Sequence, residues 1–283
     1  MGSPLSYDFM QRALVAAVLV GVVAPLIGSF LVQRRLALLG DGMGHVALTG
    51  VGLAFLLGTA PLPTAMVTAA GGAFLIEFIR DRSRTAGDVA LALLFYGGIA
   101  GGVLFASMSA TKSAASLNAY LFGSLTTVSG QDLIALVVMS LLIIVILALY
   151  GRQLFAVSLD PEVAAVQGIP VKAMSTLIAM LAAVTVVVGM RVVGLLLVSA
   201  IMIVPIAAAQ QIAPSFRTTM ALGSLLGVVA AVLGLTFSFY VDVPPGPAIV
   251  VLALLLFAVL AVVAVPMRRR ASRGTTELDR GSA

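Results

Sequence analysis

Long apolar runs, separated by short polar segments, follow one another along almost the whole chain. A transmembrane helix requires about 20 mostly apolar residues in succession. Nine stretches meet or approach this length, at about residues 12–33, 43–59, 62–80, 88–108, 132–150, 173–190, 192–213, 217–239 and 247–266. Several are short, so eight spans is an alternative count. The pattern predicts an all-α fold, a polytopic transmembrane helical bundle of about nine spans that forms a single domain over residues 1–283.

The composition agrees with a membrane protein and excludes several soluble classes. Hydrophobic residues make up 61% of the chain and charged residues only 10%, with a mean hydropathy of +1.18, whereas soluble domains carry about 25% charged residues. The net charge of +5 does not indicate a nucleic-acid partner, because the arginines lie in short loops and in the tail. With no cysteine, the chain has neither disulfides nor thiolate metal ligands. We therefore expect a lipid bilayer as its environment.

Basic residues distinguish the two sides of the predicted bundle. If nine spans alternate in direction, thirteen lysines and arginines fall on one side, and only Arg12, Lys112 and Arg191 fall on the other. Cytoplasmic loops are enriched in lysine and arginine, so we expect the N-terminus outside and the C-terminus in the cytoplasm. Residues from about 267 to 283, which include the arginine run at 268–270, are expected to form a flexible cytoplasmic tail.

The stretch at 33–52, QRRLALLGDGMGHVALTGVG, contains the only histidine of the chain. His45 follows Asp41 by four residues, so a helix would place the imidazole and the carboxylate on one face. Ionisable groups in a span are costly and are functional candidates by default, and these donors suit zinc, manganese or ferrous iron. Two ligands are too few for a closed site, although a two-fold dimer would bring four together. The alternative is that Asp41 caps a helix and His45 hydrogen-bonds within the bundle.

The segment at 151–172, GRQLFAVSLDPEVAAVQGIPVK, predicts a short helix between two spans at the cytoplasmic face. It contains a capping acid, a proline and an acid for the first turn, and a terminating glycine and proline, namely Asp160, Pro161, Glu162, Gly168 and Pro170. Two interpretations remain open from this pattern. The helix is either an ordinary solvated loop helix or a docking surface for a cytoplasmic partner.

Glycines recur at four-residue intervals in the span at 88–108. Gly97, Gly98, Gly101 and Gly102 form two overlapping GxxxG patterns there. Such spacing lets helix backbones approach closely in lipid. It predicts helix packing rather than chemistry.

Two carboxylates near span ends have two interpretations. Glu77 and Asp88 could form a second waystation for a cation, or could pair with Arg80 and Arg84, and the spacing favours pairing. Enzymatic motifs are absent, since the chain contains no GxxxxGK[ST], HExxH or GxSxG pattern. We therefore do not expect the chain itself to be an enzyme.

Five stretches, in order, resemble the zinc/manganese permease family of ATP-binding cassette metal importers. They are RRLALLGDGMGHVALTGVGLAF at 34–55, AYLFGSLTTVS at 119–129, SLDPEVAAVQGIPV at 158–171, RVVGLLLVSAIMIVPIAAAQ at 191–210 and SFYVDVPPGPAIV at 238–250. The resemblance runs from about residue 10 to residue 260 and implies the all-helical permease fold of type II importers. It also implies a homodimer of two permease copies, a separate ATP-binding cassette subunit and an extracytoplasmic metal-binding receptor, at the bacterial inner membrane.

The resemblance also implies functions for particular residues. The family's LLGDxxxH motif falls on Asp41 and His45, which are therefore expected to be ligands in the metal path. The family's coupling segment falls on 158–171 and adds Ile169 to the residues expected to couple the permease to the ATP-binding subunit. Gly44 and Thr49 stand where many members have serine and proline. A hydroxyl near His45 is thus missing, and we expect a backbone carbonyl to orient the imidazole instead.

The expected function is import of a divalent transition metal by a permease subunit without a bound prosthetic group. Zinc is the favoured metal, and manganese and iron(II) importers of the same architecture are the alternatives. A self-sufficient ion-coupled secondary carrier and a purely structural membrane subunit are less favoured. The carrier would work without an ATPase, whereas the structural subunit gives no reason for an Asp/His pair at a span border.

Overall fold

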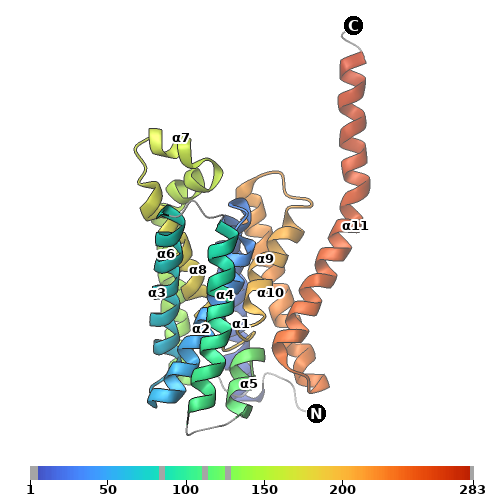
Figure 1. Ribbon diagram of the computed structural model, residues 1–283. Coiled ribbons are helices and arrows are strands. Elements are labelled where there is room, and N and C mark those ends of the chain that lie inside the picture. The colour runs from blue at the N-terminus through green and yellow to red at the C-terminus, as the bar shows by residue number, and fades with distance from the viewer. Residues whose placement is uncertain (1–5, 83–86, 110–113, 125–128, 281–283) are drawn as a thin grey trace.

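Helices are the only regular elements in the part of the chain that the computed structural model describes, residues 6–82, 87–109, 114–124 and 129–280. They are α1 (Asp8–Gln33), α2 (Ala37–Leu57), α3 (Pro61–Arg82), α4 (Gly87–Met108), α5 (Ala114–Phe122), α6 (Gly130–Leu159), α7 (Pro161–Val166), α8 (Val171–Gly189), α9 (Val198–Ala209), α10 (Phe216–Val241) and α11 (Pro245–Arg280). Within these ranges, eight helices are long and apolar enough to cross a membrane: α1, α2, α3, α4, α6, α8, α10 and α11. The predicted all-α transmembrane bundle is confirmed (Figure 1).

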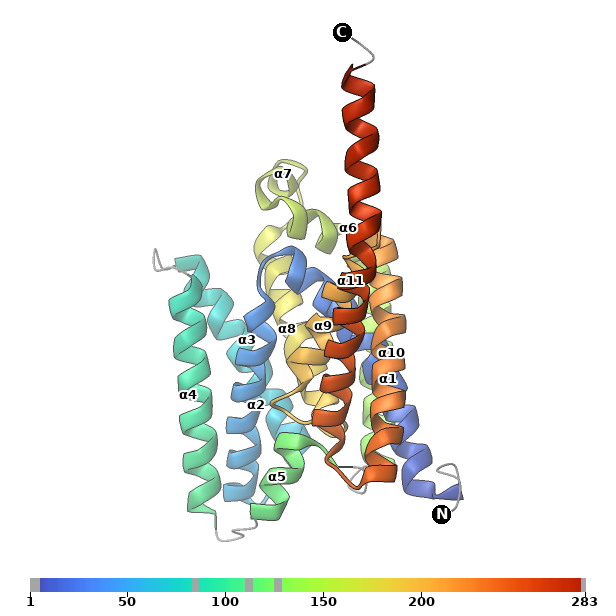
Figure 2. The ribbon, with the colours of Figure 1, turned by 90° about the vertical axis from the view of Figure 1, so that its right-hand side faces the viewer.

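The span expected at 192–213 is only partly helical, which corrects the count of nine long spans. Helix α9 begins at Val198 and has 12 residues. Before it, Gly194 takes a left-handed φ of 89°, and the N–H groups of Leu195 and Leu196 donate to carbonyls of α5 at 2.9 and 3.3 Å. These donors are satisfied by another element instead of by a further helical turn. The start of α1 and the end of α11 lie at opposite ends of the bundle (Figures 1 and 2), as an odd number of crossings requires, and the turn and α9 together are the candidate for a ninth beside the eight long helices.

Helix α1 lies within the bundle, in contact with α6, α8, α9 and α10. Glycines permit this close approach, since a side chain at Gly28 would overlap the carbonyl group of Met202 on α9. A side chain at Gly227 of α10 would likewise overlap the carbonyl oxygen of Gly21 on α1. Backbones that approach so closely exclude larger residues at the crossing points. Helix α9 is thereby fixed between α1 and α2, both of which it contacts.

The short helix α7 lies at the end of the bundle toward which the C-terminus projects, and α5 lies at the opposite end (Figures 1 and 2). Asp160 caps α7, because its Oδ1 accepts hydrogen bonds from the N–H groups of Glu162 and Val163 at 2.9 and 3.1 Å. Gly168, with a φ of 79°, follows the helix and lets the chain reverse. The short helix predicted between two spans is confirmed, at Pro161–Val166.

The last helix passes through the segment expected to be a flexible tail. Its apolar part, Pro245–Ala264, is long enough to cross a membrane. Beyond this part α11 continues as helix to Arg280, so no helix end marks the boundary expected at about residue 267. This extension projects beyond the other helices at the α7 end (Figure 2).

Candidate metal site

Asp41 and His45 lie one turn apart on α2 and share one face of that helix. Nε2 of His45 is 3.9 Å from Oδ2 of Asp41, and the two side chains are 8% and 29% exposed. This separation is too long for a hydrogen bond. The other carboxylate oxygen, Oδ1, accepts a hydrogen bond of 3.3 Å from Oγ of Ser199 on α9. In the described part of the chain no arginine or lysine pairs with Asp41, so no fixed cation there occupies its carboxylate.

The imidazole of His45 is fixed by packing rather than by a hydrogen bond. The Phe95 ring of α4 meets it edge to face, with the ring centroids 4.1 Å apart and an interplanar angle of 67°. Nδ1 of His45 is buried and has no hydrogen-bond partner among the described residues. The backbone carbonyl expected to orient this ring is therefore not found there. The Phe95 ring packs against the imidazole instead. In a neutral imidazole one of the two ring nitrogens carries a lone pair, which is the atom that binds a metal.

Asp41 borders a cavity of about 330 Å³ between α2 and α4. The residues around it are Leu38, Asp41, Leu91, Ala92, Phe95 and Tyr96. Leu38 and Tyr96, at its edge, are 71% and 70% exposed. The carboxylate is the one charged group of this lining, so a cation that enters the cavity meets a single anionic ligand.

The glycines of α4 bring its backbone against α2 at the level of the histidine. A Cβ atom at Gly98 would lie 2.6 Å from the carbonyl carbon of His45, and one at Gly102 would lie 2.6 Å from Cγ of Leu48. At Gly101 the added carbon would meet Thr49 at 3.2 Å, whereas at Gly97 it would meet nothing within 4 Å. Three of the four predicted glycines thus face α2, and Gly97 does not.

Thr49 adds a hydrogen bond to this helix pair. Its hydroxyl donates to the carbonyl oxygen of Gly98 at 2.8 Å. Gly44, on the same helix as Thr49, faces α8 and the turn before α9, because a Cβ there would lie 2.9 Å from the carbonyl oxygen of Leu195. The two positions at which the chain departs from the family pattern therefore serve helix packing on two sides of α2.

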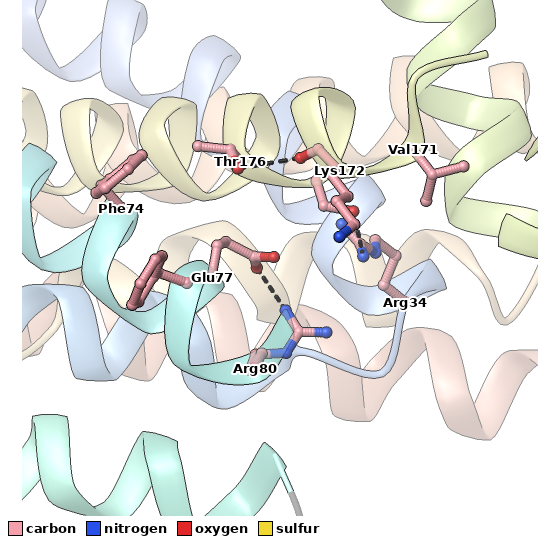
Figure 3. A pocket seen from close by; sticks show the side chains of 9 residues that line it. Arg34, Phe74, Glu77, Arg80, Val171, Lys172 and Thr176 are labelled. Carbon is pink, nitrogen blue, oxygen red and sulfur yellow. Dashed lines mark hydrogen bonds and ion pairs between the residues drawn. The ribbon is translucent and has the colours of Figure 1, made fainter. Parts of the chain in front are cut away.

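Glu77 lies in a different environment from Asp41. Its carboxylate forms an ion pair with Arg80, one turn further along α3 (Figure 3). Both side chains line a pocket of about 320 Å³ with Arg34 and Lys172. Figure 3 shows that these cations come from three separate segments of the chain.

Asp88, the other carboxylate proposed as a waystation, lies in the first turn of α4, and its side chain falls outside the described residues, as does Arg84. In the same pocket as Glu77, Nη2 of Arg34 donates to Oγ of Ser175 at 2.9 Å. Burial lowers the pKa of the Arg34 guanidinium, and the Glu77 carboxylate opposes that shift. Among the described residues, no group of three or more histidine and acidic side chains is arranged to hold a metal ion, so the candidate ligands there are limited to the predicted Asp41/His45 pair.

Comparisons with known proteins identify the family of the whole chain. The family model of the ABC 3 transport family matches residues 6–264. The chain belongs to the ABC 3 transport family. It is accordingly the membrane-spanning permease of an ABC transporter, and ATP hydrolysis belongs to a separate subunit.

Relatives of this ABC 3 permease carry the names of metal transport systems. It is 35% identical over 255 residues, covering 90% of this chain and 87% of the relative, to the manganese transport system membrane protein MntC of Halalkalibacterium halodurans. It is 32% identical over 262 residues, covering 93% and 94%, to the manganese import system permease protein ScaB of Streptococcus gordonii. The solved structure of PsaBC from Streptococcus pneumoniae in complex with Fab matches with a TM-score of 0.82 and 30% identity, covering 90% of this chain and 92% of that one.

The segment expected to couple this ABC 3 permease to its ATP-binding subunit forms a compact connection between α6 and α8. The N–H of Ile169 donates to the carbonyl oxygen of Ala164 at 3.1 Å, which folds the chain back onto α7. Pro170 then precedes the first turn of α8. Val166, at the end of α7, is 90% exposed. The side chain of Val166 is thus an exposed apolar group at the α7 end of the bundle.

Two partners of Asp41 and His45 could not be predicted from the sequence. Ser199 and Phe95 contact Asp41 and His45 across separations of 158 and 50 positions along the chain, respectively. Ser199 falls in the stretch at 191–210 that resembles the family, but nothing in its spacing connects it to α2. Such contacts depend on how the helices pack, which single-chain periodicity does not report.

Proposed function

We propose that this permease conducts Mn²⁺ into the cytoplasm, with Asp41 and His45 as the protein ligands of the path. The observation that carries the proposal is the Asp41 carboxylate, which has no arginine or lysine partner among the described residues, beside the imidazole of His45, whose Nδ1 has no hydrogen-bond partner there. The sequence alone favours zinc, whereas the relatives named for manganese transport favour manganese. The hydroxyl of Ser199 beside Asp41 supports the second choice, because Mn²⁺ prefers oxygen donors more than zinc does.

A site with two ligands per copy suits transport. Manganese takes six ligands, so water and the Asp41/His45 pair of a second permease copy would supply the remainder. An ion held by few protein ligands can also leave, as conduction requires. A homodimer about an axis near α2 and α4 therefore belongs to the proposal.

The partners are proposed from the two ends of the bundle. At one end, α7 and its exposed Val166 offer a docking element to an ATP-binding subunit, and Arg34, Arg80 and Lys172 gather near it. Cytoplasmic surfaces are enriched in such residues, so we place this end and the C-terminus inside a bacterial inner membrane. The opposite end, with the N-terminus, would then receive the metal from an extracytoplasmic receptor.

The test is metal accumulation in a host without its own manganese importers. The permease is produced with its ATP-binding subunit and receptor, and cellular manganese, zinc and iron are measured. Manganese should rise with the native chain and should not rise with His45→Ala or without the ATP-binding subunit. A rise of zinc or iron instead of manganese would assign a different substrate to the same transporter. Uptake that persists without the ATP-binding subunit would show a secondary carrier.

A further inference from the structure

A second large cavity lies between α6 and α10, at the end of the bundle that carries α7. Its volume is about 590 Å³. The residues around it are Phe30, Leu147, Ala148, Gly151, Arg152, Phe155, Ser215, Phe216, Arg217 and Met220. The lining thus combines aromatic and aliphatic side chains with two arginines and no carboxylate. That combination suits a molecule with an apolar body and an anionic end.

The apolar part of the cavity is built around an aromatic cluster. The ring of Phe216 lies 4.6 Å from that of Phe155 and 5.3 Å from that of Phe30, centroid to centroid. Outside the cavity, α6 presents further apolar side chains, of which Val145 and Leu149 are 45% and 71% exposed. An acyl chain that follows α6 would therefore contact apolar surface both inside the cavity and beside it.

The two arginines lie at the level of a membrane interface. The α6 helix begins at Gly130, next to the Ser129–Asp132 capping box, and Arg152 follows at a distance of about 33 Å along the helix. The hydrocarbon core of a bilayer is about 30 Å thick, so Arg152 emerges where lipid headgroups begin. Arg217 is the second residue of α10, at the start of that helix's apolar run. Both guanidinium groups are thus set at the depth of lipid phosphates.

Among the described residues, Arg152 and Arg217 lack the carboxylate partners that two other pocket-lining arginines have. Arg80 pairs with Glu77, and Arg191 pairs with Asp132 at 3.0 Å. In the described part of the chain, neither Arg152 nor Arg217 forms an ion pair, and both side chains are exposed. Two unneutralised guanidinium groups in one cavity favour an anionic ligand, for which arginine offers paired donors.

We propose that this cavity binds an anionic phospholipid, with the headgroup phosphate on Arg152 and Arg217 and an acyl chain along Leu147 and Met220. Basic pockets between transmembrane helices at the cytoplasmic side commonly accept such headgroups. The site is separate from Asp41 and His45. It does not depend on which metal the permease carries.

The chain contains no tryptophan, which permits a local fluorescence test. We place one reporter in the cavity with Phe155→Trp and one on the same helix outside it with Leu142→Trp, where the native side chain is 48% exposed. Each full-length variant is reconstituted in phosphatidylcholine vesicles with a minor fraction of brominated lipid. The brominated lipid is either phosphatidylglycerol or phosphatidylcholine, and quenching reports the lipid that occupies each position. Leu147→Trp serves as a second cavity reporter if Phe155→Trp does not reconstitute.

At the cavity reporter, brominated phosphatidylglycerol should bind more tightly than brominated phosphatidylcholine, by about fivefold for each arginine. The preference should disappear in the double variant Arg152→Gln/Arg217→Gln. It should persist in the control variant Arg12→Gln, which removes an exposed arginine near the N-terminus. At Leu142→Trp the two lipids should quench equally. Equal quenching at the cavity reporter, or a preference that survives the double variant, would overturn the proposal. A lipid preference of the same size at the Leu142→Trp reporter would also overturn the proposal.

Discussion

Two carboxylates near the ends of neighbouring helices have opposite surroundings in this permease. Asp41 on α2 has a hydroxyl group and an imidazole beside it, at 3.3 and 3.9 Å. Glu77 on α3 is paired with the guanidinium of Arg80 and shares its pocket with two more cations (Figure 3). Both acids lie in a mostly apolar bundle, yet among the described residues Glu77 has an arginine partner and Asp41 has none.

The difference shows how a helical bundle separates a binding group from a structural one. A guanidinium that is already bound to a carboxylate occupies the position that a metal would need, and it repels a divalent cation as well. The Ser199 hydroxyl next to Asp41 orients the carboxylate without cancelling its charge. Under the proposed function, the identity of the neighbouring side chain, more than the depth of the acid in the bundle, determines which carboxylate is free to bind a cation.

The largest effect is expected when a ligand of the proposed site is removed. Asp41→Asn and His45→Ala should each lower manganese uptake at least about tenfold, because neither leaves a complete pair of donors. Radioactive manganese uptake into proteoliposomes with the ATP-binding subunit measures the loss. ATP hydrolysis by the assembled transporter is the control for folding. Uptake within twofold of native in both variants would contradict the assignment.

A smaller effect should follow from widening the contact between α2 and α4. Gly98→Ala places a methyl group 2.6 Å from the carbonyl carbon of His45, so we expect a loss of about 1–3 kcal/mol in stability, as for overpacked cores, with reduced uptake. Gly97→Ala is the matched control, because its methyl group meets nothing within 4 Å. Thermal unfolding in detergent should separate the two variants. Equal unfolding temperatures would show that the helices are not in close contact at His45.

The Glu77/Arg80 pair should affect stability more than transport. Glu77→Gln leaves Arg80 without its partner and should cost about 1–2 kcal/mol, since the two side chains are only 10% and 24% exposed. The double variant Glu77→Gln/Arg80→Gln should recover part of this loss, because the Arg80 guanidinium is then no longer left without its partner. Manganese uptake should stay within about twofold of native in both. A tenfold loss of uptake in Glu77→Gln would instead make Glu77 a second waystation.

The smallest effect is expected from the hydroxyl beside Asp41. Ser199→Ala removes one hydrogen bond of 3.3 Å to the Asp41 carboxylate and should raise the half-saturating manganese concentration about threefold, because a bond this long contributes at the low end of the usual range. Ser224→Ala is the control, because it removes a bond of similar length, 3.2 Å to the carbonyl oxygen of Val22, between α10 and α1. If both variants behave alike, Ser199 does not influence the carboxylate.

Local signals predicted much of this fold, and long-range contacts account for what they missed. The apolar runs predicted the long helices, and Asp160 with Pro161 predicted the start of α7, because both signals depend on neighbouring residues. The break before α9 was not predictable, since it depends on hydrogen bonds from Leu195 and Leu196 to α5, more than 70 positions earlier in the chain. The sequence of an apolar run such as 192–213 is the same whether its backbone N–H groups hydrogen-bond within one helix or to the carbonyls of another element.

The candidate site, like the fold, could be predicted from the sequence only where it depends on neighbouring residues. The four-residue spacing of Asp41 and His45 predicts a shared helix face, whereas Ser199 and Phe95 reach them only after the bundle has assembled. The choice of metal also lies beyond the sequence, because the same two ligands accept zinc, manganese or iron. Here the relatives named for manganese transport shift the proposal away from zinc.

The most direct test of the account is whether a manganese ion bound to the permease is coordinated by its one histidine. The chain is produced with ¹⁵N-labelled histidine, purified through a tag without histidine, loaded with Mn²⁺ and measured by pulsed electron paramagnetic resonance. We predict a ¹⁵N coupling from imidazole that is retained in Glu77→Gln and lost in His45→Ala. Bound manganese without a histidine coupling in the native chain would contradict the proposal that His45 lies in the metal path.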